Sequence, residues 1–378
     1  MSLLHADATH ASSPLFSTTL SLPDCDATGW VVVDSMVDGL AMGGTRMTQT
    51  VDATELAALA RAMTHKLALV DLPIGGAKAG IRPNGPVRDR EHLMRTFGRV
   101  TRPLLHGGVY LGCDQGTTHP DRDMFFAAAG YDIATRPGAT RLNVDWAEFW
   151  RTMVDITGFG VATAALGAIR ASGARTPQRV VLQGFGTVGR GVAQHLAAHG
   201  HQIVAVADIL GTVEDPAGLP VDKLIACTST DGTIDRSGLP TSVRVHDGDR
   251  AWLKVDTDVL VLAAGADAID ESVVSSVRAK IIVEGGNMSC TKPARRMLGE
   301  AGLTVLPDVV VNVGGAAVTG CIIAGVAPNG LNVPQMSAWL REWIASKINK
   351  NCELIQELSA SGSAEPVAEL LAQRNIAW

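Results

Sequence analysis

Three charged side chains could carry chemistry, and one of them, Lys78, stands alone in a run of glycines and alanines. Lys78 lies in "PIGGAKAGI", Lys66 precedes it by twelve residues in "MTHKLAL", and Asp114 follows in "GCDQGT". Each alone would be interpreted as a solvated surface charge. In a tight apolar turn, however, burial and a second nearby lysine lower the pKa of an ammonium from about 10.4 towards neutrality. A lysine with such a lowered pKa can take part in general acid–base chemistry.

A glycine pattern in "VVLQGFGTVGRGVAQHL" indicates a second kind of chemistry. Gly184, Gly186 and Gly189 have the spacing G-x-G-x-x-G, after a predicted strand and at the start of a predicted helix. The first glycine permits a tight turn, the second lets the backbone approach a pyrophosphate, and the third lets helix and strand pack closely. Unpaired amides at the start of the helix would face the phosphate charge. This context favours a dinucleotide site over a glycine-rich turn that binds nothing.

The next predicted strand, "HQIVAVAD", ends at Asp208, 24 residues after Gly184. A carboxylate at that place can accept hydrogen bonds from the adenosine ribose of a dinucleotide, whereas an arginine there accommodates the 2′-phosphate of NADP. No arginine occurs in "DILGTVEDP", which begins at this aspartate. The sequence therefore predicts NAD as the cofactor rather than NADP.

Short apolar runs alternate with helical patterns in the second half of the chain. Strands are expected in "RVVLQGF", "HQIVAVAD", "TDVLVLAAG", "AKIIVEGG" and "LTVLPDVVVN". This alternation is typical of a parallel sheet with helices on both faces, the doubly wound arrangement. Nearer the N-terminus, residues 30–36 are expected to form a strand and residues 53–70 a helix. The pattern in 335–378 is helical again, with one buried stripe expected from Trp339, Trp343, Ile344, Ile348 and Leu354.

Composition limits the class of protein. The 378 residues suggest two domains, and 46% of hydrophobic residues suffice for substantial cores. A net charge of −6 argues against a nucleic-acid-binding surface, which needs a basic excess. We expect no membrane span, because no apolar run of about 18 residues is evident, and no secretory signal at the N-terminus. Six scattered cysteines without a C-x-x-C pattern fit reduced thiols in a cytoplasm.

Two other groups of residues could carry chemistry but have simpler explanations. His195, His199 and His201 are close enough in sequence to bind a metal, yet they fall at the end of a predicted helix, where histidines complement the helix dipole. Cys113 could be a nucleophile, but only His119 stands near it in sequence, and a buried structural thiol is the simpler interpretation. No metal site is therefore predicted.

Several of these stretches together resemble one known family. "LAMGGTRM", "MTHK" followed by "GGAK", "CDQGT", "DITGFGV", "EGGNMSCT" and "PDVVVNVGG" are similar, in this order, to motifs of the glutamate/leucine/phenylalanine/valine dehydrogenases, from about residue 30 onwards. The resemblance implies an α/β enzyme with an N-terminal α/β catalytic domain, a doubly wound Rossmann cofactor domain and a cleft between them. The expected domains are residues 1–150 (catalytic), 151–334 (cofactor) and a helical segment, 335–378, that returns to the catalytic domain.

The resemblance also assigns roles to individual positions. Lys66 would bind the substrate α-carboxylate, Lys78 would be the catalytic lysine and Asp114 the general acid/base. The other residues expected to line the substrate are Met42, Gly43, Gly44, Gly112, Ala316 and Thr319. The residues expected to contact the cofactor are Thr157, Gly184, Phe185, Gly186, Thr187, Val188, Gly189, Asp208, Ala263, Asn287 and Asn312. No metal is needed, because the lysines would supply the positive charge that polarises the substrate.

The implied reaction is the reversible oxidative deamination of an L-amino acid by NAD⁺, which gives a 2-oxo acid and ammonia. In family members that use glutamate, a lysine stands where this chain has Met42, so an apolar substrate side chain, aliphatic or aromatic, is expected. The alternatives are a glutamate-type dehydrogenase and a non-catalytic paralogue that binds a nucleotide or an amino acid. The acid–base residues argue against the paralogue. The family usually assembles, which predicts a homo-oligomer.

The chain departs from the family pattern near its catalytic aspartate. Gln115 stands where an apolar residue is usual, the segment 118–123 is unfamiliar, and Val313 replaces an alanine. These changes leave the reaction type in place but keep open which amino acid is used. The glycines around Lys78 are expected to let substrate, cofactor and water approach it closely.

Overall fold

The computed structural model describes residues 13–174 and 177–376, which form two compact units. The first unit consists of the described residues up to Arg151, of Ala316–Met336, and of the described residues from Leu371 onwards. The second unit consists of Thr152–Gly315, as far as described, and of Ser337–Leu370. Residues 1–12, for which no secretory signal is expected, lie outside the described part of the chain.

Beyond Arg151, the chain passes between the units at other places than the sequence suggests. Helix α10 (Gly314–Ile323) belongs to the first unit from Ala316 onwards, whereas most of α11 (Val333–Ala360) belongs to the second. At Gly320 of α10, an added Cβ would lie 2.6 Å from Leu72, so this helix packs directly on the first unit. Helix α11 is tied to the second unit by an ion pair of 2.6 Å between Arg341 and Asp155.

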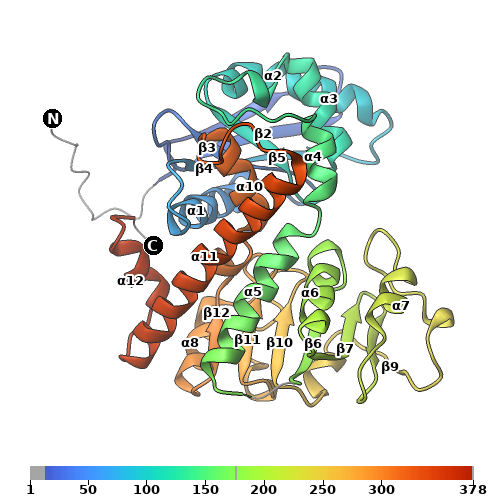
Figure 1. The fold of residues 1–378 in the computed structure, drawn as a ribbon. Helices are drawn as coiled ribbons and strands as arrows, with labels where there is room; N and C mark the ends of the chain where they lie inside the picture. The colour runs from blue at the N-terminus through green and yellow to red at the C-terminus, as the bar shows by residue number, and fades with distance from the viewer. Residues whose placement is uncertain (1–12, 175–176, 377–378) are drawn as a thin grey trace. The chain divides into compact units, whose positions relative to one another are not determined.

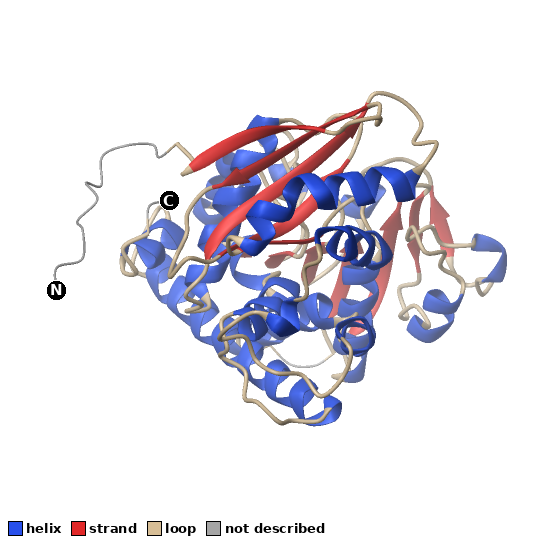
Figure 2. Ribbon diagram, turned by 90° about the horizontal axis from the view of Figure 1, so that it is seen from above, coloured by secondary structure: helices blue, strands red, loops and turns tan. Residues whose placement is uncertain are grey.

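Within residues 13–151, five strands form a mixed sheet in the order β1-β2-β4-β3-β5. The two pairs β1–β2 and β2–β4 are antiparallel, and β3 lies parallel to both β4 and β5. Figure 2 shows these strands side by side with helices packed against them. The strands are β1 (Phe16–Ser21), β2 (Ala27–Val33), β3 (Ala41–Met47), β4 (Gly75–Pro83) and β5 (Val109–Cys113). The helices are α1 (Ala53–Leu69), α2 (Arg90–His106), α3 (His119–Ala129), η1 (Ile133–Thr135) and α4 (Trp146–Thr152).

Side chains at helix starts fix where the helices of the first unit begin. Asp52 caps α1 by accepting a hydrogen bond from the backbone N–H of Glu55, as the expected helix over 53–70 requires. The unfamiliar segment 118–123 is the start of α3. Thr118 and Asp121 form a reciprocal capping box there, with a proline in the first turn.

In the described part of the second unit, seven strands form a sheet in the order β12-β11-β10-β6-β7-β8-β9. The first five are parallel, as expected, and β8 and β9 extend the sheet with antiparallel pairing. The strands are β6 (Arg179–Gln183), β7 (Gln202–Asp208), β8 (Gly211–Glu214), β9 (Arg244–His246), β10 (Val259–Leu262), β11 (Ile281–Glu284) and β12 (Thr304–Leu306).

Helices cover both faces of this sheet. In Figure 1, α5 (Ile156–Ala171) and α6 (Thr187–Ala198) lie in front of the parallel strands. The opposite face buries Val181, Leu260 and Ile282 against Trp252 of η3 and Leu298 of α8, in a core that excludes water. The remaining elements are α7 (Val221–Ala226), η2 (Arg236–Gly238), η3 (Ala251–Lys254), η4 (Val274–Ser276), α8 (Lys292–Glu300), α9 (Asp308–Val311) and α12 (Pro366–Ala372), the last of which ends in the first unit.

Two local expectations are corrected. The run expected as one strand in "LTVLPDVVVN" is the short strand β12 followed by the helical turn α9, because Pro307 cannot donate to a strand ladder and starts a helix well. In α11, Ile344 and Ile348 are buried as expected. The other three residues of the expected stripe are only half-buried, and two of them, Trp339 and Trp343, stack on each other with ring centroids 6.3 Å apart.

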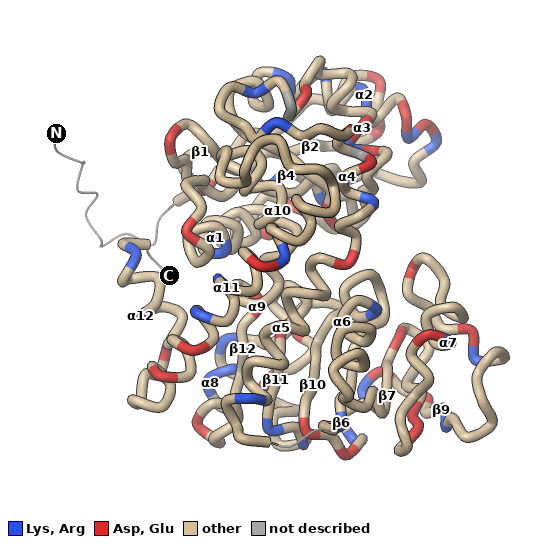
Figure 3. The backbone as a smooth tube through the Cα atoms, viewed as in Figure 1, with Lys and Arg blue, Asp and Glu red and all other residues tan. Residues whose placement is uncertain are grey.

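One stretch of the described residues, Glu148–Ala171, is long and apolar enough to span a membrane, with a mean hydropathy of 1.5. This finding corrects the expectation that no such run exists. It is weak evidence for a membrane, because buried core helices pass the same test and 61% of the stretch's apolar window is buried. Figure 3 shows basic and acidic residues scattered along the described chain in both units.

Candidate functional site

Lys78 and Asp114, 36 residues apart in sequence, are brought together in the first unit. The Lys78 ammonium lies 3.0 Å from Oδ2 of Asp114, and the two side chains are 6% and 16% exposed. Lys78 stands on β4 and Asp114 directly follows β5, with β3 between these strands and parallel to both. The pair has the groups that acid–base chemistry needs, largely shielded from water.

Lys66 lies in the last turn of α1 and is 6% exposed. Added Cβ atoms at Gly76 and Gly80 of β4 would point into α1. Alternate residues of a strand share a face, so Lys78, between these glycines, projects to the face that α1 covers. Both lysines are therefore buried on the same side of the sheet.

The glycines beside Lys78 are required by packing and not by the approach of a ligand. An added Cβ at Gly76 would lie 2.2 Å from the carbonyl oxygen of Ala60, and one at Gly80 would lie 2.6 Å from Leu56. Helix α1 therefore rests directly on the β4 backbone, and the expectation that these glycines leave room for substrate, cofactor and water is wrong. Lys78 also lies within a strand, whereas the sequence suggests a tight turn.

Arg46 of β3 is a further charged group of this site, and sequence reasoning missed it. Its Nε donates to Oδ2 of Asp114 at 3.0 Å, and its Nη1 donates to Glu55 at 2.5 Å. Burial alone would raise the pKa of the Asp114 carboxyl, but Lys78 and Arg46 outweigh burial and hold that pKa well below its usual range. Arg46 belongs to the quoted "GGTR" stretch, yet no spacing rule links position 46 to position 114.

Met42 lies fully buried on β3, at 2% exposure, between Gly76 of β4 and Tyr110 of β5 in the strand register. An added Cβ at Gly112 would lie 3.1 Å from the ring of Tyr110. The side chains around this part of β3 and β5 are thus apolar or aromatic. Sequence reasoning did not include Tyr110 among the pocket residues.

Gly43 and Gly44 have a packing reason of their own. An added Cβ at Gly43 would lie 1.6 Å from the carbonyl oxygen of Ala77, and one at Gly44 would lie 2.9 Å from Cβ of Asp114. Only glycine lets β3 approach its neighbours this closely. The last two residues expected to line the substrate, Ala316 and Thr319, lie on the part of α10 that belongs to the first unit, and Thr319 is 5% exposed.

The glycine-rich turn of the second unit has the expected local geometry. Gly184 has a φ of +98°, and an added Cβ there would lie 2.7 Å from the carbonyl of Ala263. An added Cβ at Gly189 would lie 2.2 Å from the carbonyl oxygen of Gly184, so helix and turn are in contact. At Gly186 nothing lies within 4 Å of the Cβ position, so this side of the residue is open. Of the intervening residues, Phe185 is buried, while Thr187 and Val188 open α6.

Asp208 does not stand alone at the end of β7. Arg236 of η2 pairs with both carboxylate oxygens, one contact measuring 2.5 Å, and the backbone N–H groups of Leu210 and Ile234 donate at 2.8 and 2.7 Å. The Asp208 side chain is only 2% exposed. The inference of NAD from a missing arginine is therefore corrected, because the arginine comes from 28 residues further along the chain.

A turn near Arg236 also lies against the glycine-rich turn. Gly232, with a φ of +90°, has its Cβ position 3.0 Å from the backbone nitrogen of Gly186. The carbonyl oxygen of Ser229 accepts a hydrogen bond of 3.4 Å from Arg190 of α6. The segment 229–236 thus connects the glycine-rich turn with the partners of Asp208.

The two asparagines expected near the nicotinamide lie together in the second unit. Nδ2 of Asn312 donates to Oδ1 of Asn287 at 3.2 Å, and Thr157 accepts from the backbone N–H of Gly315 at 3.1 Å. Within the described part of the chain, Oδ1 of Asn312 is buried without a hydrogen-bond partner. An unpaired buried acceptor costs free energy, and a carboxamide N–H would satisfy it. Together with the open Cβ side of Gly186, these residues fit a nicotinamide dinucleotide.

The side chains set aside in the sequence have other partners. His195 bonds to Asp155 at 2.9 Å and His199 to the carbonyl oxygen of His195 at 2.7 Å. Burial raises the pKa of the Cys113 thiol to about 12, so it is a poor nucleophile. Among residues 13–174 and 177–376, no group of histidines, cysteines and acidic residues has the arrangement of a metal site.

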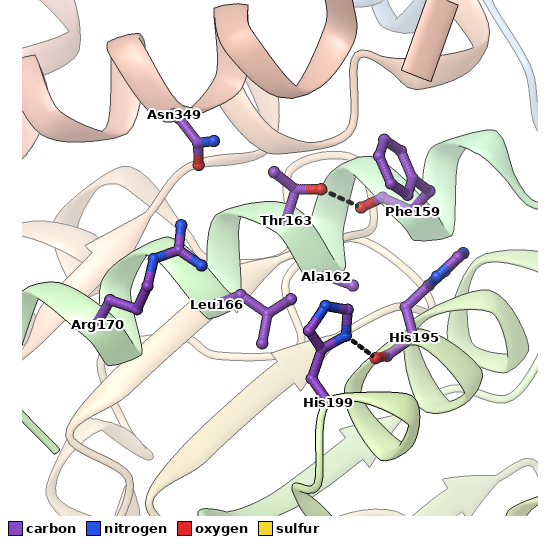
Figure 4. A pocket seen from close by; sticks show the side chains of 8 residues that line it. All are labelled: Phe159, Ala162, Thr163, Leu166, Arg170, His195, His199 and Asn349. Carbon is purple, nitrogen blue, oxygen red and sulfur yellow. Dashed lines mark hydrogen bonds between the residues drawn. The ribbon is translucent and has the colours of Figure 1, made fainter. Parts of the chain in front are cut away.

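A pocket of ≈ 190 Å³ opens between α5, α6 and α11 of the second unit (Figure 4). It is lined by Phe159, Ala162, Thr163, Leu166, Arg170, His195, His199 and Asn349. None of these is a residue expected to bind substrate or cofactor. The pocket is therefore separate from the chemistry described above.

Family models match most of the chain. Residues 151–377 match the model described as Glutamate/Leucine/Phenylalanine/Valine dehydrogenase, and residues 21–128 match Glu/Leu/Phe/Val dehydrogenase, dimerisation domain. The chain belongs to the glutamate/leucine/phenylalanine/valine dehydrogenase family, which confirms the resemblance and the fold class. It is therefore an amino-acid dehydrogenase, and its cofactor class is the nicotinamide nucleotides.

Relatives in this family are named for glutamate. The chain is 30% identical over 300 residues to the NADP-specific glutamate dehydrogenase of Saccharolobus shibatae, a match that covers 76% of this chain and 68% of that protein. It is 32% identical over 282 residues to the NADP(+)-dependent glutamate dehydrogenase of Pyrobaculum calidifontis, covering 72% and 66%. These names support the glutamate-type alternative better than the expected apolar substrate, and they leave NAD unconfirmed.

A solved structure resembles the whole fold. The hetero-hexameric glutamate dehydrogenase from Thermus thermophilus, in its leucine-bound form, aligns with a TM-score of 0.81 at 25% identity. The alignment covers 96% of this chain and 88% of that one. The similarity therefore extends over both units.

Proposed function

We propose that this chain catalyses the reversible oxidative deamination of an L-amino acid to its 2-oxo acid and ammonia. The observation that carries the proposal is the contact of 3.0 Å between Lys78 and Asp114, in a site mostly closed to water. A non-catalytic paralogue would need no such acid–base pair. Incubation with single amino acids and either dinucleotide, followed by absorbance of the reduced cofactor, tests the proposal; no turnover of any amino acid would contradict it.

The first unit would bind and orient the substrate. The buried ammonium of Lys66 would pair with the α-carboxylate and so fix the α-carbon. A nicotinamide held by the second unit supplies the acceptor for the α-hydride. Asp114, which enters the reaction ionised, would take a proton from the α-amino group at Oδ1, the oxygen that Lys78 and Arg46 leave open.

Lys78 and Asp114 would then hydrolyse the resulting imine. Lys78 would hold a water against the iminium carbon, and the water would lose its first proton to solvent as the C–O bond forms. Asp114 would return its proton to the nitrogen and then accept the remaining hydroxyl proton, so that the C–N bond breaks and ammonia leaves while the carbonyl of the 2-oxo acid forms. The residues that would act on the substrate belong to the first unit, and those that would hold the nicotinamide belong to the second.

We propose glutamate as the first substrate to consider, because the named relatives are glutamate dehydrogenases. An apolar amino acid remains the second candidate on one observation. Met42 is buried between Gly76 and Tyr110, so a distal carboxylate placed there would lose its hydration without gaining a cation.

Substitution of Met42 by lysine is expected to raise the ratio of kcat/KM for glutamate to that for leucine by about 10-fold or more, because a charge-assisted hydrogen bond contributes roughly 1.5–3 kcal/mol. The measurement compares glutamate, leucine and phenylalanine in both proteins. Met42→Leu is the matched control and should leave the ratio unchanged. If Met42→Lys also leaves it unchanged, Met42 does not face the substrate side chain.

We further propose that Asp208 and Arg236 together set the choice of dinucleotide. Because Arg236 neutralises Asp208, a 2′-phosphate would not meet an unpaired carboxylate, and NADP⁺ should be used at least as well as NAD⁺. Arg236→Gln should lower kcat/KM for NADP⁺ by about 10-fold and spare NAD⁺. Equal losses with both dinucleotides would show that Arg236 supports the fold and does not determine the choice between NAD⁺ and NADP⁺.

A homo-oligomer is proposed from the dimerisation-domain match over residues 21–128 and from the hexameric relative. A cytoplasmic location is proposed from the six cysteines, all of which are free thiols in the structure.

A further inference from the structure

We propose that Arg46 is a positioning residue that keeps Asp114 ionised and oriented while Lys78 serves the substrate; this inference rests on the function proposed above. Arg46 lies on β3, between the strand that carries Lys78 and the strand that leads to Asp114. Its side chain is 10% exposed and contacts two carboxylates, Asp114 at 3.0 Å and Glu55 at 2.5 Å.

Both cations contact the same oxygen of the Asp114 carboxylate. Arg46 and Lys78 both contact Oδ2, each at 3.0 Å, while Oδ1 has no hydrogen-bond partner in the described part of the chain. The backbone is held as well, because the N–H of Asp114 donates to Oγ1 of Thr117, which itself donates to the carbonyl oxygen of Thr45. The carboxylate therefore cannot turn without breaking these contacts, and Oδ1 is the oxygen positioned for proton transfer.

Arg46 becomes necessary when Lys78 moves. A lysine that holds water or a developing charge on the substrate must give up part of its contact with Asp114. A largely buried carboxylate left without a counter-charge is strongly destabilised, whereas a guanidinium that stays in place keeps it paired. The planar guanidinium can also hold Asp114 and Glu55 at once through different nitrogens, which a lysine cannot do with the same geometry.

A purely structural explanation has different consequences. If Arg46 only tied β3 to α1 through Glu55, its loss would lower stability without a selective effect on kcat. A matched control exists in the same unit. Arg61 pairs with the buried Asp34 at 3.0 Å. In the described part of the chain, Asp114 and Lys78 make no hydrogen bond or ion pair with Arg61.

The experiment compares steady-state kinetics of the unaltered chain, Arg46→Met, Arg46→Lys and Arg61→Met. Arg46→Met should lower kcat by about 10- to 100-fold, because small misplacements of a catalytic group have effects of that size, with KM within about threefold. The acid limb of its pH profile should move to higher pH, because Asp114 loses one of two cations. Arg46→Lys should recover part of kcat, and Arg61→Met should keep kcat within about threefold even if it is less stable.

A kcat for Arg46→Met within about threefold of the unaltered value, or an unchanged pH profile, would overturn the inference. If Arg46→Met does not fold, Arg46→Lys tests the same inference. A full kcat in Arg46→Lys would show that the guanidinium is not needed. If the unaltered chain turns over no amino acid, the proposed function fails by itself. Crystal structures of the chain and of Arg46→Lys would then still decide whether the Asp114 carboxylate turns when the guanidinium is absent, and an unmoved carboxylate would refute the positioning role.

Discussion

Replacement of Lys78 by alanine is expected to lower kcat by roughly 10²–10⁴-fold, the usual contribution of a positioned acid–base group. The reason is that Lys78 is the cation that can hold water against the substrate, while Asp114 remains paired with Arg46. Initial rates with the best amino acid measure the effect. Dinucleotide affinity, followed by cofactor fluorescence, should stay within about threefold, because the glycine-rich turn belongs to the other unit.

Lys78→Met is the control for packing. Methionine keeps most of the apolar stem that α1 covers and removes only the ammonium. It should lose as much activity as Lys78→Ala while unfolding at a higher temperature. Retention of more than about a tenth of kcat in either variant would remove Lys78 from the proposed mechanism.

Replacement of Asp114 by asparagine is expected to lower kcat by about 10²-fold or more, since the amide keeps the shape but cannot carry a proton between the nitrogen and water. Stability should fall as well, because two buried cations lose their shared counter-charge. The partly exposed pair of Asp270 and Arg250, 2.9 Å apart, offers the control. Asp270→Asn should leave kcat unchanged, and equal losses in the two variants would contradict a catalytic role for Asp114.

The stability difference caused by Asp114→Asn should depend on pH. The pKa of Asp114 is depressed in the folded protein, so its ionisation stabilises the fold fully above the ordinary carboxyl pKa of about 3.9. That contribution is lost as the pH falls through the lower, folded-state pKa. Urea unfolding of both proteins at several pH values should therefore show the difference shrinking on the acid side of pH 4 and constant near neutrality.

The features that the sequence predicts well are local ones. The spacing of Gly184, Gly186 and Gly189 specifies a turn whose contacts span only a few residues, and the structure has that turn. Alternating apolar runs likewise predict the five parallel strands around it. The lysine at position 78 and the aspartate at position 114 were found through a motif, and the structure brings them within 3.0 Å.

The features that the sequence does not predict depend on contacts between positions that are far apart in the chain. Arg236 reaches Asp208 from 28 residues away, and Arg46 reaches Asp114 from 68 residues away, with no periodicity to connect them. The boundary inside α10 depends on how Gly320 packs on Leu72. Such contacts follow from the three-dimensional order of the strands, which a single sequence does not contain.

The close packing of α1 on β4 affects how tolerance to mutation in this segment should be interpreted. Gly76 leaves no space for a side chain under α1, and Gly43 leaves none where β3 meets β4, so nearly every replacement there should fail, as at Lys78. A mutational scan that scores activity alone would therefore show the packing positions and the catalytic positions of this segment as equally intolerant of change. The two kinds separate only when abundance and turnover are scored independently, since glycine variants should disappear from the folded pool while lysine variants accumulate as inactive protein.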